Sequence, residues 1–492
     1  MRNAWSGHTF PHPAGRRRWM KDASSMDPDR PVQYILEHHR HLGPIFEIVV
    51  FGQKFVFVTD AELAAELNDE SRFAKANSPA LDGLRGIAGD GLFTAYNEEP
   101  NWQLAHDLLV PAFTKQAMQR YHPVMAETLD ELFTVWDAGT GRVDASADMT
   151  RLTLETIGRT GFSQAFGSFT TTELHPFVEG MVTALTIGRR KGVIGALPAA
   201  KLLERRLDRQ HAEQLDYVNR FLDDIVVARR RAPTSGGDDL LGIMLDQAHP
   251  ETGARLSDEN IRYQILTFLV AGHETTSGAL SFALYYLVRH PEALAKVQAE
   301  TDAILGPDPD ATPSYEQVAR FRYIRKVLDE ALRLWPTAPG YARTPRETTT
   351  LGGRWTMTPG DWALVFLPLV QRDPAVWGET ADAFDPDRPR PPRLASTAKP
   401  FGTGERACIG RQFAVHEATM ALARILHRYD VTGDPAYELR IDERLTLMPQ
   451  GMELTLSRRT PGLSAPGGAA PGGMPRPRSR PPGHRAVPKP SY

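Results

Sequence analysis

The residues Phe401-Gly-Thr-Gly-Glu-Arg-Ala-Cys-Ile-Gly410 contain the single cysteine of this chain and open a segment with helical apolar spacing, 408–429. A lone cysteine is most often a small buried apolar residue, but it can also be a nucleophile or one axial ligand of a metal. One cysteine excludes an intramolecular disulfide and any zinc or iron–sulfur site built from several cysteines. The residues around Cys408 must therefore decide its role.

These neighbours favour a metal ligand. A helix that begins at the cysteine presents unpaired N–H groups and the positive end of its dipole, and both lower the pKa of a thiol. Gly404 and Gly410 leave room for a flat macrocycle to approach the backbone. Arg406 can reach a carboxylate at the edge of such a cofactor, and Phe401 can keep water away from the sulfur. As a haem ligand, a thiolate pushes electron density to the iron and favours cleavage of the O–O bond.

A second motif, Ala271-Gly-His-Glu-Thr-Thr-Ser277, lies in the middle of a long predicted helix, 258–290. Gly, Glu and Thr do not stabilise the centre of a buried helix, and such a break of local preference is typical of functional sites. Gly272 can let a substrate or dioxygen come close, and the Thr275 hydroxyl can bond back to a carbonyl and widen the turn. We expect His273 to be a structural hydrogen-bonding residue. The apolar run is too short and too polar at its centre for a membrane span.

Together the two motifs resemble the signatures of the cytochrome P450 superfamily, Phe-x-x-Gly-x-Arg-x-Cys-x-Gly and Ala/Gly-Gly-x-Glu/Asp-Thr-Thr. The resemblance implies a haem b cofactor with Cys408 as the iron ligand. It also implies that Thr275 acts in oxygen activation and that Glu274 helps to relay protons. Trp102 and His106 share one helical face, because they are four residues apart. The cofactor-binding residues implied in this way are Trp102, His106, Arg343, Phe401, Arg406, Cys408 and Gly410.

Glu330-Ala-Leu-Arg333 places opposite charges one helical turn apart. Such a pair is commonly exposed and contributes only a few tenths of a kcal/mol, about 0.2–0.5 kcal/mol. In the superfamily it is a buried pair completed by an arginine from a downstream loop, and the matching residue here is Arg388. The usual Glu-Arg-Phe of that loop is Asp387-Arg388-Pro389 in this chain, which makes the loop atypical. We expect a structural role for Glu330, Arg333 and Arg388.

Further stretches, among them Asp90-Gly-Leu-Phe-Thr94 and Glu259-Asn-Ile-Arg-Tyr-Gln264, resemble the haem domain of bacterial fatty-acid hydroxylases that are fused to a diflavin reductase. This resemblance covers residues 31–458. It implies a substrate pocket in which Phe93 and Ala338 lie over the distal haem face. The pocket residues are Leu81, Ala88, Phe93, Ala271, Ala338 and Leu445.

The substrate class stays open at this point. The fatty-acid hydroxylases hold the substrate carboxylate with an arginine and a tyrosine, and we matched these positions to Gly52 and Val56. Lys54 or the run Arg189-Arg190-Lys191 could replace that clamp, although a charge run is usually a solvated surface. We therefore favour a monooxygenase that tailors a secondary metabolite. Fatty-acid hydroxylation is the alternative, and a non-catalytic haem-thiolate sensor is an alternative of another class.

Composition predicts a single large catalytic domain. Hydrophobic residues make up 41% of the chain, and the formal net charge of -3 provides no field for nucleic acid or anionic lipid. We expect an irregular, loose N-terminal arm at 1–30, a mostly α domain with a minor β region at 31–460, and a disordered Pro/Gly/Arg-rich tail at 461–492. The predicted helices are 100–115, 124–136, 151–161, 202–231, 258–290, 291–305, 315–335 and 408–429, and the predicted strand regions are 45–58, 351–357, 362–366 and 438–457.

The expected partners are a small apolar substrate, dioxygen and a separate electron donor, a ferredoxin or flavodoxin with its reductase. We expect neither a nucleic acid nor a membrane. The first apolar stretch, 45–58, contains Glu47, Gln53 and Lys54 and is typical of a strand pair, not of an anchor. A cytoplasmic location follows as an expectation.

Overall fold

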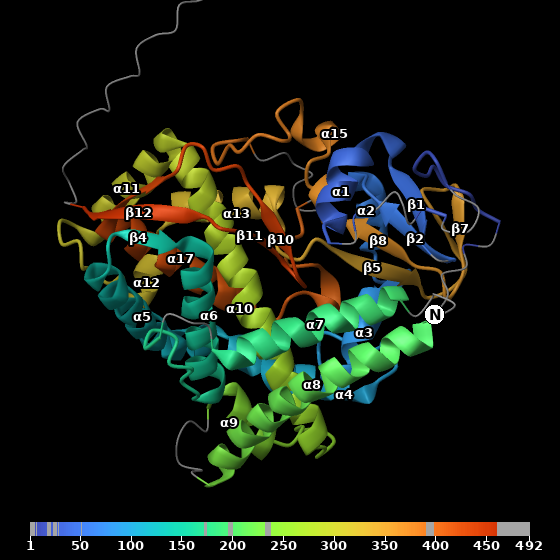
Figure 1. The fold of residues 1–492 in the computed structure, drawn as a ribbon, viewed down its shortest axis with the longest axis horizontal. Coiled ribbons are helices and arrows are strands. Elements are labelled where there is room, and N and C mark those ends of the chain that lie inside the picture. The colour runs from blue at the N-terminus through green and yellow to red at the C-terminus, as the bar shows by residue number, and fades with distance from the viewer. Residues whose placement is uncertain are drawn as a thin grey trace, which may run out of the picture.

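The computed structural model describes residues 5, 7–16, 21–22, 27, 29–50, 52–171, 175–194, 200–231, 238–389 and 398–459. The long helix α10 (Asp258–Arg289) runs through the middle of the molecule (Figure 1). It packs against α6 (Ala145–Phe162), α13 (Arg322–Leu334) and α17 (Arg411–Arg428). Most side chains of α10 are buried, because helices cover it on several sides.

The ends of α10 are set by local sequence. Ser257 caps the first turn by accepting the Asn260 N–H at 3.1 Å, and two acidic residues follow it, as the helix dipole favours. Pro291 begins the next helix, α11 (Pro291–Leu305).

The other helices are α1 (Pro31–His38), α2 (Ala61–Leu67), α3 (Pro79–Ala88), α4 (Pro100–Leu109), α5 (Lys115–Ala138), α7 (Pro176–Ile194), α8 (Ala200–Arg231), α9 (Leu240–Asp246), α12 (Tyr315–Val318), α14 (Leu367–Val370) and α15 (Pro374–Trp377), with short 3-10 turns η2 (Arg40–Leu42), η3 (Val110–Phe113) and η4 (Gly404–Arg406).

The main sheet joins segments that are far apart in the chain. Its order is β1-β2-β8-β5-β3, in which only the β2–β8 pair is parallel. Figure 1 shows this sheet at one end of the molecule, with strands from the first and last thirds of the chain side by side. Its strands are β1 (Ile45–Val50), β2 (Gln53–Val58), β3 (Phe73–Ala76), β5 (Gly340–Pro345) and β8 (Ala363–Phe366). The smaller sheets are β4 (Arg142–Asp144) with β12 (Glu453–Arg458) and β9 (Tyr429–Gly433), β6 (Thr349–Leu351) with β7 (Trp355–Met357), and β10 (Ile441–Glu443) with β11 (Leu447–Pro449).

The predicted class, mostly α with a minor β region, is confirmed, but several predicted boundaries differ. The helices expected at 100–115, 124–136 and 151–161 are α4 (Pro100–Leu109), α5 (Lys115–Ala138) and α6 (Ala145–Phe162). The segment 315–335 is two helices, α12 and α13, because Phe321 leaves the helical conformation (φ -73°, ψ 75°) and buries its ring. The helix after the cysteine begins at Arg411 and not at Cys408, so the thiol precedes the helix instead of starting it.

The expectation of a loose N-terminal arm is wrong for the residues that the structure describes. Trp5 and Phe10 are 1% and 2% exposed and pack in the apolar cluster beneath the main sheet. The Trp5 indole N–H donates to the Trp362 carbonyl at 2.9 Å. Arg16 pairs with Asp22 at 2.6 Å and with Glu47 on β1 at 2.9 Å. Two aromatic rings and one ion-pair cluster are enough to fix this otherwise polar segment.

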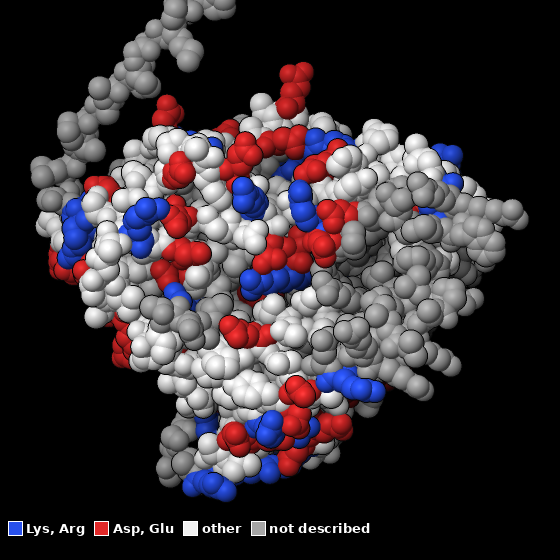
Figure 2. All heavy atoms as spheres, in the orientation of Figure 1, with Lys and Arg blue, Asp and Glu red and all other residues white. Residues whose placement is uncertain are grey.

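Charged side chains of both signs are mixed on the face drawn in Figure 2. Figure 2 shows acidic and basic side chains interspersed on one face, so the described side chains there create no field of a single sign. Within the described ranges, no helix combines the length and the apolar character that crossing a bilayer requires.

Candidate functional site

Cys408 lies in a tight loop between η4 and α17. Its N–H donates to the Phe401 carbonyl at 2.8 Å, and its carbonyl accepts the Arg411 N–H at 3.3 Å. Cys408 is an exposed residue, yet protein atoms surround its thiol closely enough that burial raises the pKa of the thiol. The Gly410 N–H and the Arg411 charge act in the opposite direction but do not outweigh burial. The sequence predicted that the pKa of the thiol would be lowered, and this is wrong when only the protein groups act on it. A bound metal cation would have to stabilise the thiolate.

The two glycines of the loop have different roles. A Cβ on Gly410 would lie 4.0 Å from Cys408 Sγ and 3.9 Å from the Phe113 ring, so this glycine keeps the flank of the sulfur open. Gly404 has a φ of +70°, and a Cβ there would overlap the Glu70 carboxylate. Gly404 therefore makes room for Glu70 and not for a macrocycle, which corrects the expectation from sequence.

Arg406 and Trp102 lie together beside the loop. The Arg406 guanidinium stands 3.8 Å from the centre of the Trp102 ring, and the Trp102 and His106 rings stack at 4.9 Å. Burial lowers the pKa of Arg406 to about 10. The His106 Nδ1 lies 3.5 Å from the Asp107 carboxylate.

Two more cations complete this basic cluster. Arg343 is 3% exposed, burial lowers its pKa, and its Nε has no hydrogen-bond acceptor within the described part of the chain. Lys75 lies opposite Arg343 in the β3–β5 pairing and donates to the carbonyls of Phe93 and Ala95 at 2.6 and 3.0 Å. Burial, together with the charges of Arg406 and Arg85, lowers the Lys75 pKa to about 7.

Arg343 is buried with an orphaned Nε, and the half-buried Lys75 and Arg406 lie near it. Cations gathered in this way are stabilised by an anion. The cluster of Lys75, Arg343 and Arg406 therefore fits a cofactor that carries carboxylates at its edge, as haem b does. Three of the predicted cofactor residues, Arg343, Arg406 and Trp102, meet in this cluster. Lys75 was missed, because nothing in its local sequence distinguishes it and only the strand register places it beside Arg343.

The central turn of α10 has one open and one buried side. Ala271 is exposed although the residues around it are buried, and Thr275 is half-buried on the same face. The Thr275 hydroxyl donates to the Ala271 carbonyl at 2.7 Å, as predicted, and the turn stays α-helical. Gly272 does not face this side: a Cβ on it would approach Ile157 of α6 at 2.8 Å, so its small size serves helix packing.

Glu274 and His273 point to the buried side of α10. Glu274 is 2% exposed and accepts the Thr446 hydroxyl at 3.2 Å, while its second oxygen has no partner within the described residues. Burial raises the Glu274 pKa to about 7. His273 Nδ1 lies 2.6 Å from the Leu269 carbonyl, and burial lowers the His273 pKa to about 4, in agreement with the predicted structural role.

Segments that carry predicted pocket residues contact α10. The Leu92 N–H donates to Gln264 of α10 at 3.0 Å, which brings the segment of Phe93 against the helix. Phe93 itself is 45% exposed, an unusual value for a large aromatic ring. The Leu447 N–H donates to the Thr337 carbonyl at 2.9 Å, and a Cβ on Gly278 would touch both of these residues. Ala271 belongs to α10 itself, and α3, which carries Leu81 and Ala88, packs against α10. Phe93, Ala338 and Leu445 lie within two residues of the contacts given above, and the pocket itself stays a prediction.

Glu330, Arg333 and Arg388 form one buried group. Arg333 donates to both carboxylate oxygens of Glu330 at 2.8 Å, and Arg388 Nε lies 3.4 Å from Glu330 Oε1. Side-chain exposure is 8% or less for all three. The structure thus brings the three together despite the atypical Asp387 and Pro389, and their structural role stays a prediction.

The positions matched to a carboxylate clamp do not form a site. Gly52 is exposed in the turn between β1 and β2, and Val56 is fully buried in the cluster of Trp5. The Lys54 ammonium contacts Glu47 at 3.1 Å and the His8 carbonyl at 2.9 Å, so Lys54 is already engaged and the suggestion that it replaces the clamp is wrong. The side chains of Arg189, Arg190 and Lys191 lie outside the described residues, and only their backbone in α7 is placed.

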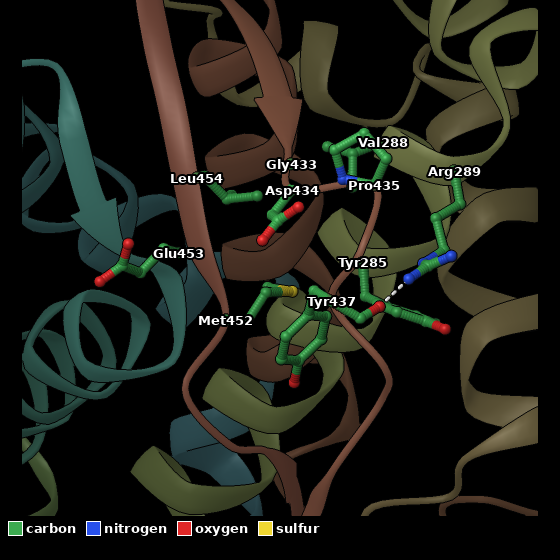
Figure 3. Close-up of a pocket in the computed structure, with 10 residues that line it drawn as sticks. All are labelled: Tyr285, Val288, Arg289, Gly433, Asp434, Pro435, Tyr437, Met452, Glu453 and Leu454. Atoms are coloured by element: carbon green, nitrogen blue, oxygen red, sulfur yellow. Dashed lines mark hydrogen bonds between the residues drawn. The ribbon is translucent and has the colours of Figure 1, made fainter.

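A surface cleft of about 270 Å³ lies elsewhere, between the end of α10 and the β9 and β12 strands (Figure 3). Arg289 donates to the Tyr437 carbonyl across it. The cleft shares no residue with the predicted site. Its lining residues are Tyr285, Val288, Arg289, Gly433, Asp434, Pro435, Tyr437, Met452, Glu453 and Leu454.

Comparison with known proteins agrees with this geometry. The family model "Cytochrome P450" matches residues 19–456. The chain is 40% identical over 444 residues to the bifunctional cytochrome P450/NADPH–P450 reductase 2 of Bacillus subtilis, which is 89% of this chain and 42% of that protein. It is 40% identical over 453 residues to the bifunctional cytochrome P450/NADPH–P450 reductase of Bacillus cereus, 91% of this chain and 42% of that protein.

A fungal relative matches the chain with similar identity and coverage. The chain is 40% identical over 443 residues to a self-sufficient cytochrome P450 monooxygenase of Aspergillus niger, 88% of this chain and 40% of that protein. The chain therefore spans only the 40–42% of these relatives that aligns with it. The family model covers most of the chain and agrees with the cysteine loop, so the chain belongs to the cytochrome P450 family, whose cofactor is haem b.

Proposed function

We propose that this chain inserts one oxygen atom from dioxygen into an apolar substrate, by hydroxylation or epoxidation. The observation that carries the proposal is the α10 turn: Ala271 and the Thr275 hydroxyl lie on its open face, and Glu274, on its buried side, has a pKa that burial raises to about 7. A group that titrates near neutrality is suited to moving protons. A haem-thiolate sensor, the alternative of another class, has no need of such a carboxyl next to its ligand side.

Each residue of the site would have a separate task. Bound haem would supply the activation of dioxygen, with a thiolate ligand that favours O–O cleavage. Cys408 would ligate the iron, and Phe401 and Gly410 would flank the sulfur. Thr275 would hold a proton donor on the substrate side, and Glu274 would exchange protons with it. Haem carboxylates would be held by Trp102, His106, Arg343 and Arg406, together with Lys75.

The electron source and the location belong to the same proposal. A ferredoxin or flavodoxin with its reductase would deliver electrons, and the protein would work in the cytoplasm. The names of the bacterial relatives place a reductase on the same chain, which is the alternative arrangement. Turnover with a separate donor system and dioxygen, compared with peroxide alone, distinguishes a monooxygenase from a peroxide-driven enzyme and from a sensor.

The first prediction tests the ligand. The reduced carbon-monoxide complex of the purified protein should absorb at about 450 nm, because thiolate ligation shifts the haem band. Cys408→Ser should abolish this band, since a serine oxygen does not replace the thiolate. If the mutant spectrum equals that of the wild type, Cys408 is not the ligand and the proposed site fails.

The substrate is proposed to be a bulky, weakly charged secondary metabolite. The six predicted lining residues are all apolar, and Phe93 exposes a large part of its ring. The matched clamp positions do not contribute to this choice, because Val56 is buried beneath the sheet. Fatty-acid hydroxylation is the alternative to be tested.

The second prediction follows from this lining. A carboxylate that finds no cation loses a charge-assisted hydrogen bond of roughly 1.5–3 kcal/mol, which is about one to two orders of magnitude in affinity. In a spectral titration of the ferric protein, medium-chain fatty acids should bind more weakly than uncharged polycyclic molecules of similar size. Phe93→Ala should widen the range of bound molecules without loss of haem. Tight fatty-acid binding that weakens in an Arg189→Ala/Arg190→Ala variant would show that the fatty-acid alternative is correct.

A further inference from the structure

Glu70 is a carboxylate outside the predicted site that contacts the cysteine loop directly. It lies between α2 and β3, and both of its oxygens are 3.1 Å from the Glu405 N–H. Glu405 belongs to η4, the turn that leads to Cys408. A Cβ on Gly404, in the same turn, would overlap the Glu70 carboxylate.

The segment that carries Glu70 is fixed by neighbours on the main sheet. The Glu70 carbonyl accepts Arg346 Nε at 2.8 Å, and the Tyr341 hydroxyl donates to Asn68 at 2.8 Å. Both donors belong to β5 or follow it directly. The carboxylate is therefore presented to the loop from a rigid frame, as a positioning group requires.

Arg343 acts on the other side of the same glycine. Its Nη2 donates to the Thr403 carbonyl at 3.3 Å, and its Nη1 is 3.9 Å from Glu70 Oε1. The peptide groups on either side of Gly404 thus lie between a cation and an anion, with the carbonyl toward Arg343 and the N–H toward Glu70. Opposite charges placed in this way favour one orientation of these peptides.

Two backbone hydrogen bonds close the loop that contains both the held turn and the cysteine. The Ala407 N–H donates to the Gly404 carbonyl at 3.0 Å, and the Cys408 N–H donates to the Phe401 carbonyl at 2.8 Å. A change in the orientation of the Gly404 peptide would therefore change where the thiol stands. Glu70 is half-buried, so its charge is only partly screened by solvent.

We propose that Glu70 is a positioning residue for the cysteine ligand: its carboxylate holds the Gly404–Glu405 turn that sets Cys408, and its charge, next to Arg343, tunes the electron affinity of the haem. The proposal rests on the haem-thiolate site described under the proposed function. Groups beyond the direct ligands are known to orient ligands and to tune metal centres in this way.

Two substitutions separate the two contributions. Glu70→Gln keeps an oxygen acceptor for the Glu405 N–H and removes the charge. Glu70→Asp keeps the charge but shortens the side chain by one methylene, so the acceptor no longer reaches the turn. The measurements are the fraction of the reduced carbon-monoxide complex that shows the thiolate band, and the midpoint potential of the haem.

The two substitutions should change different readouts. Glu70→Gln should keep the thiolate band and move the midpoint potential to more positive values, because a negative charge near the haem favours the oxidised state. Glu70→Asp should at least double the fraction that has lost the thiolate band, with a smaller change of potential. Glu66→Gln is the matched control. Glu66 lies four residues before Glu70, pairs with Arg72 and accepts the Gly352 N–H, and it does not reach the cysteine loop. The thiolate band and the midpoint potential of this variant should therefore stay at wild-type values.

Other outcomes overturn the inference. Equal loss of the thiolate band in Glu70→Gln and Glu70→Asp, or in the Glu66→Gln control, would show that Glu70 acts only on general stability. Unchanged band and potential in both variants would show that Glu70 does not act on the ligand. If the wild type itself lacks the thiolate band, the proposed haem site fails, which is a separate result from failure of the Glu70 variants.

Discussion

At the scale of single residues, Glu274 has the environment with the clearest physical consequence. Its carboxyl is buried in α10, with one hydrogen bond to Thr446, and its pKa is raised from 4.5 to about 7. Between these two pH values the folded protein keeps a proton that the unfolded chain has released. The contribution of Glu274 to the folding free energy is therefore complete below pH 4.5 and is lost as the pH rises through about 7.

The third prediction uses this difference. One pKa unit corresponds to about 1.4 kcal/mol, so wild type should lose roughly 3 kcal/mol of stability relative to Glu274→Gln as the pH rises from below 4.5 to above 7. The measurement is the free energy of unfolding of both proteins in denaturant across this pH range. Glu251→Gln, in an exposed loop, is the control and should follow wild type closely. A difference between wild type and Glu274→Gln that is constant with pH would contradict the burial argument.

The residues of the site were predictable where a short motif fixes them and not where only the fold brings them together. Cys408, Glu274 and Thr275 stand in local motifs, so their residue types identify them in the sequence. Lys75 and Glu70 belong to no motif, and they reach the loop only because β3 pairs with β5 and because α2 ends against η4. Spacing along the chain carries no information about contacts of this kind.

At the scale of elements, α13 depends on one arginine. Arg333 makes five hydrogen bonds, two to Glu330 and three to the carbonyls of Gln371, Ala381 and Ala383, at 2.6–3.0 Å. Its guanidinium also stands 4.8 Å from the centre of the Trp377 ring. One side chain thus joins α13 to the segment that leads toward the cysteine loop.

The fourth prediction concerns this group. Arg333→Ala leaves the Glu330 carboxylate and three carbonyls buried with too few donors, so unfolding should become easier by about 3–5 kcal/mol. Arg325→Ala is the control on the same helix, because the Arg325–Asp329 pair is 30% and 37% exposed and should contribute about 1 kcal/mol or less. Denaturant unfolding of the three proteins measures both effects. A similar loss in both variants would mean that burial does not distinguish the two pairs.

Elements with strong end signals were predicted well, and short helices were not. α10 has a serine cap and two acidic first-turn residues, and α11 begins with a proline followed by a glutamate. Their predicted bounds agree with the structure to within one residue. α1, α2 and α3 span 8, 7 and 10 residues, too short for a clear apolar period, and they were missed. Tertiary packing holds such helices, so their sequence alone does not define them.

At the scale of the whole molecule, the main sheet joins the two ends of the chain. The order β1-β2-β8-β5-β3 takes strands from 45–76 and from 340–366, and the sequence showed only that both regions contain strands. Strand order follows from which apolar faces can be buried together, and this is a property of the complete chain. The N-terminal segment belongs to the same assembly, because Trp5 and Phe10 close the cluster below the sheet.

The fifth prediction tests whether this segment is part of the folded unit. Trp5 is 1% exposed, its indole N–H donates to the Trp362 carbonyl, and its ring packs on Phe10 at 5.1 Å. Trp5→Ala removes a large buried ring and should lower the free energy of unfolding by about 3–5 kcal/mol. Trp5→Phe keeps most of the apolar contact but leaves the Trp362 carbonyl without this donor, and should cost about 1–3 kcal/mol. Thermal unfolding of the two variants and wild type measures the order of stability, which should be wild type, then Phe, then Ala. An alanine variant as stable as wild type would mean that residues 1–30 form a loose arm after all, and that the sheet is complete without them.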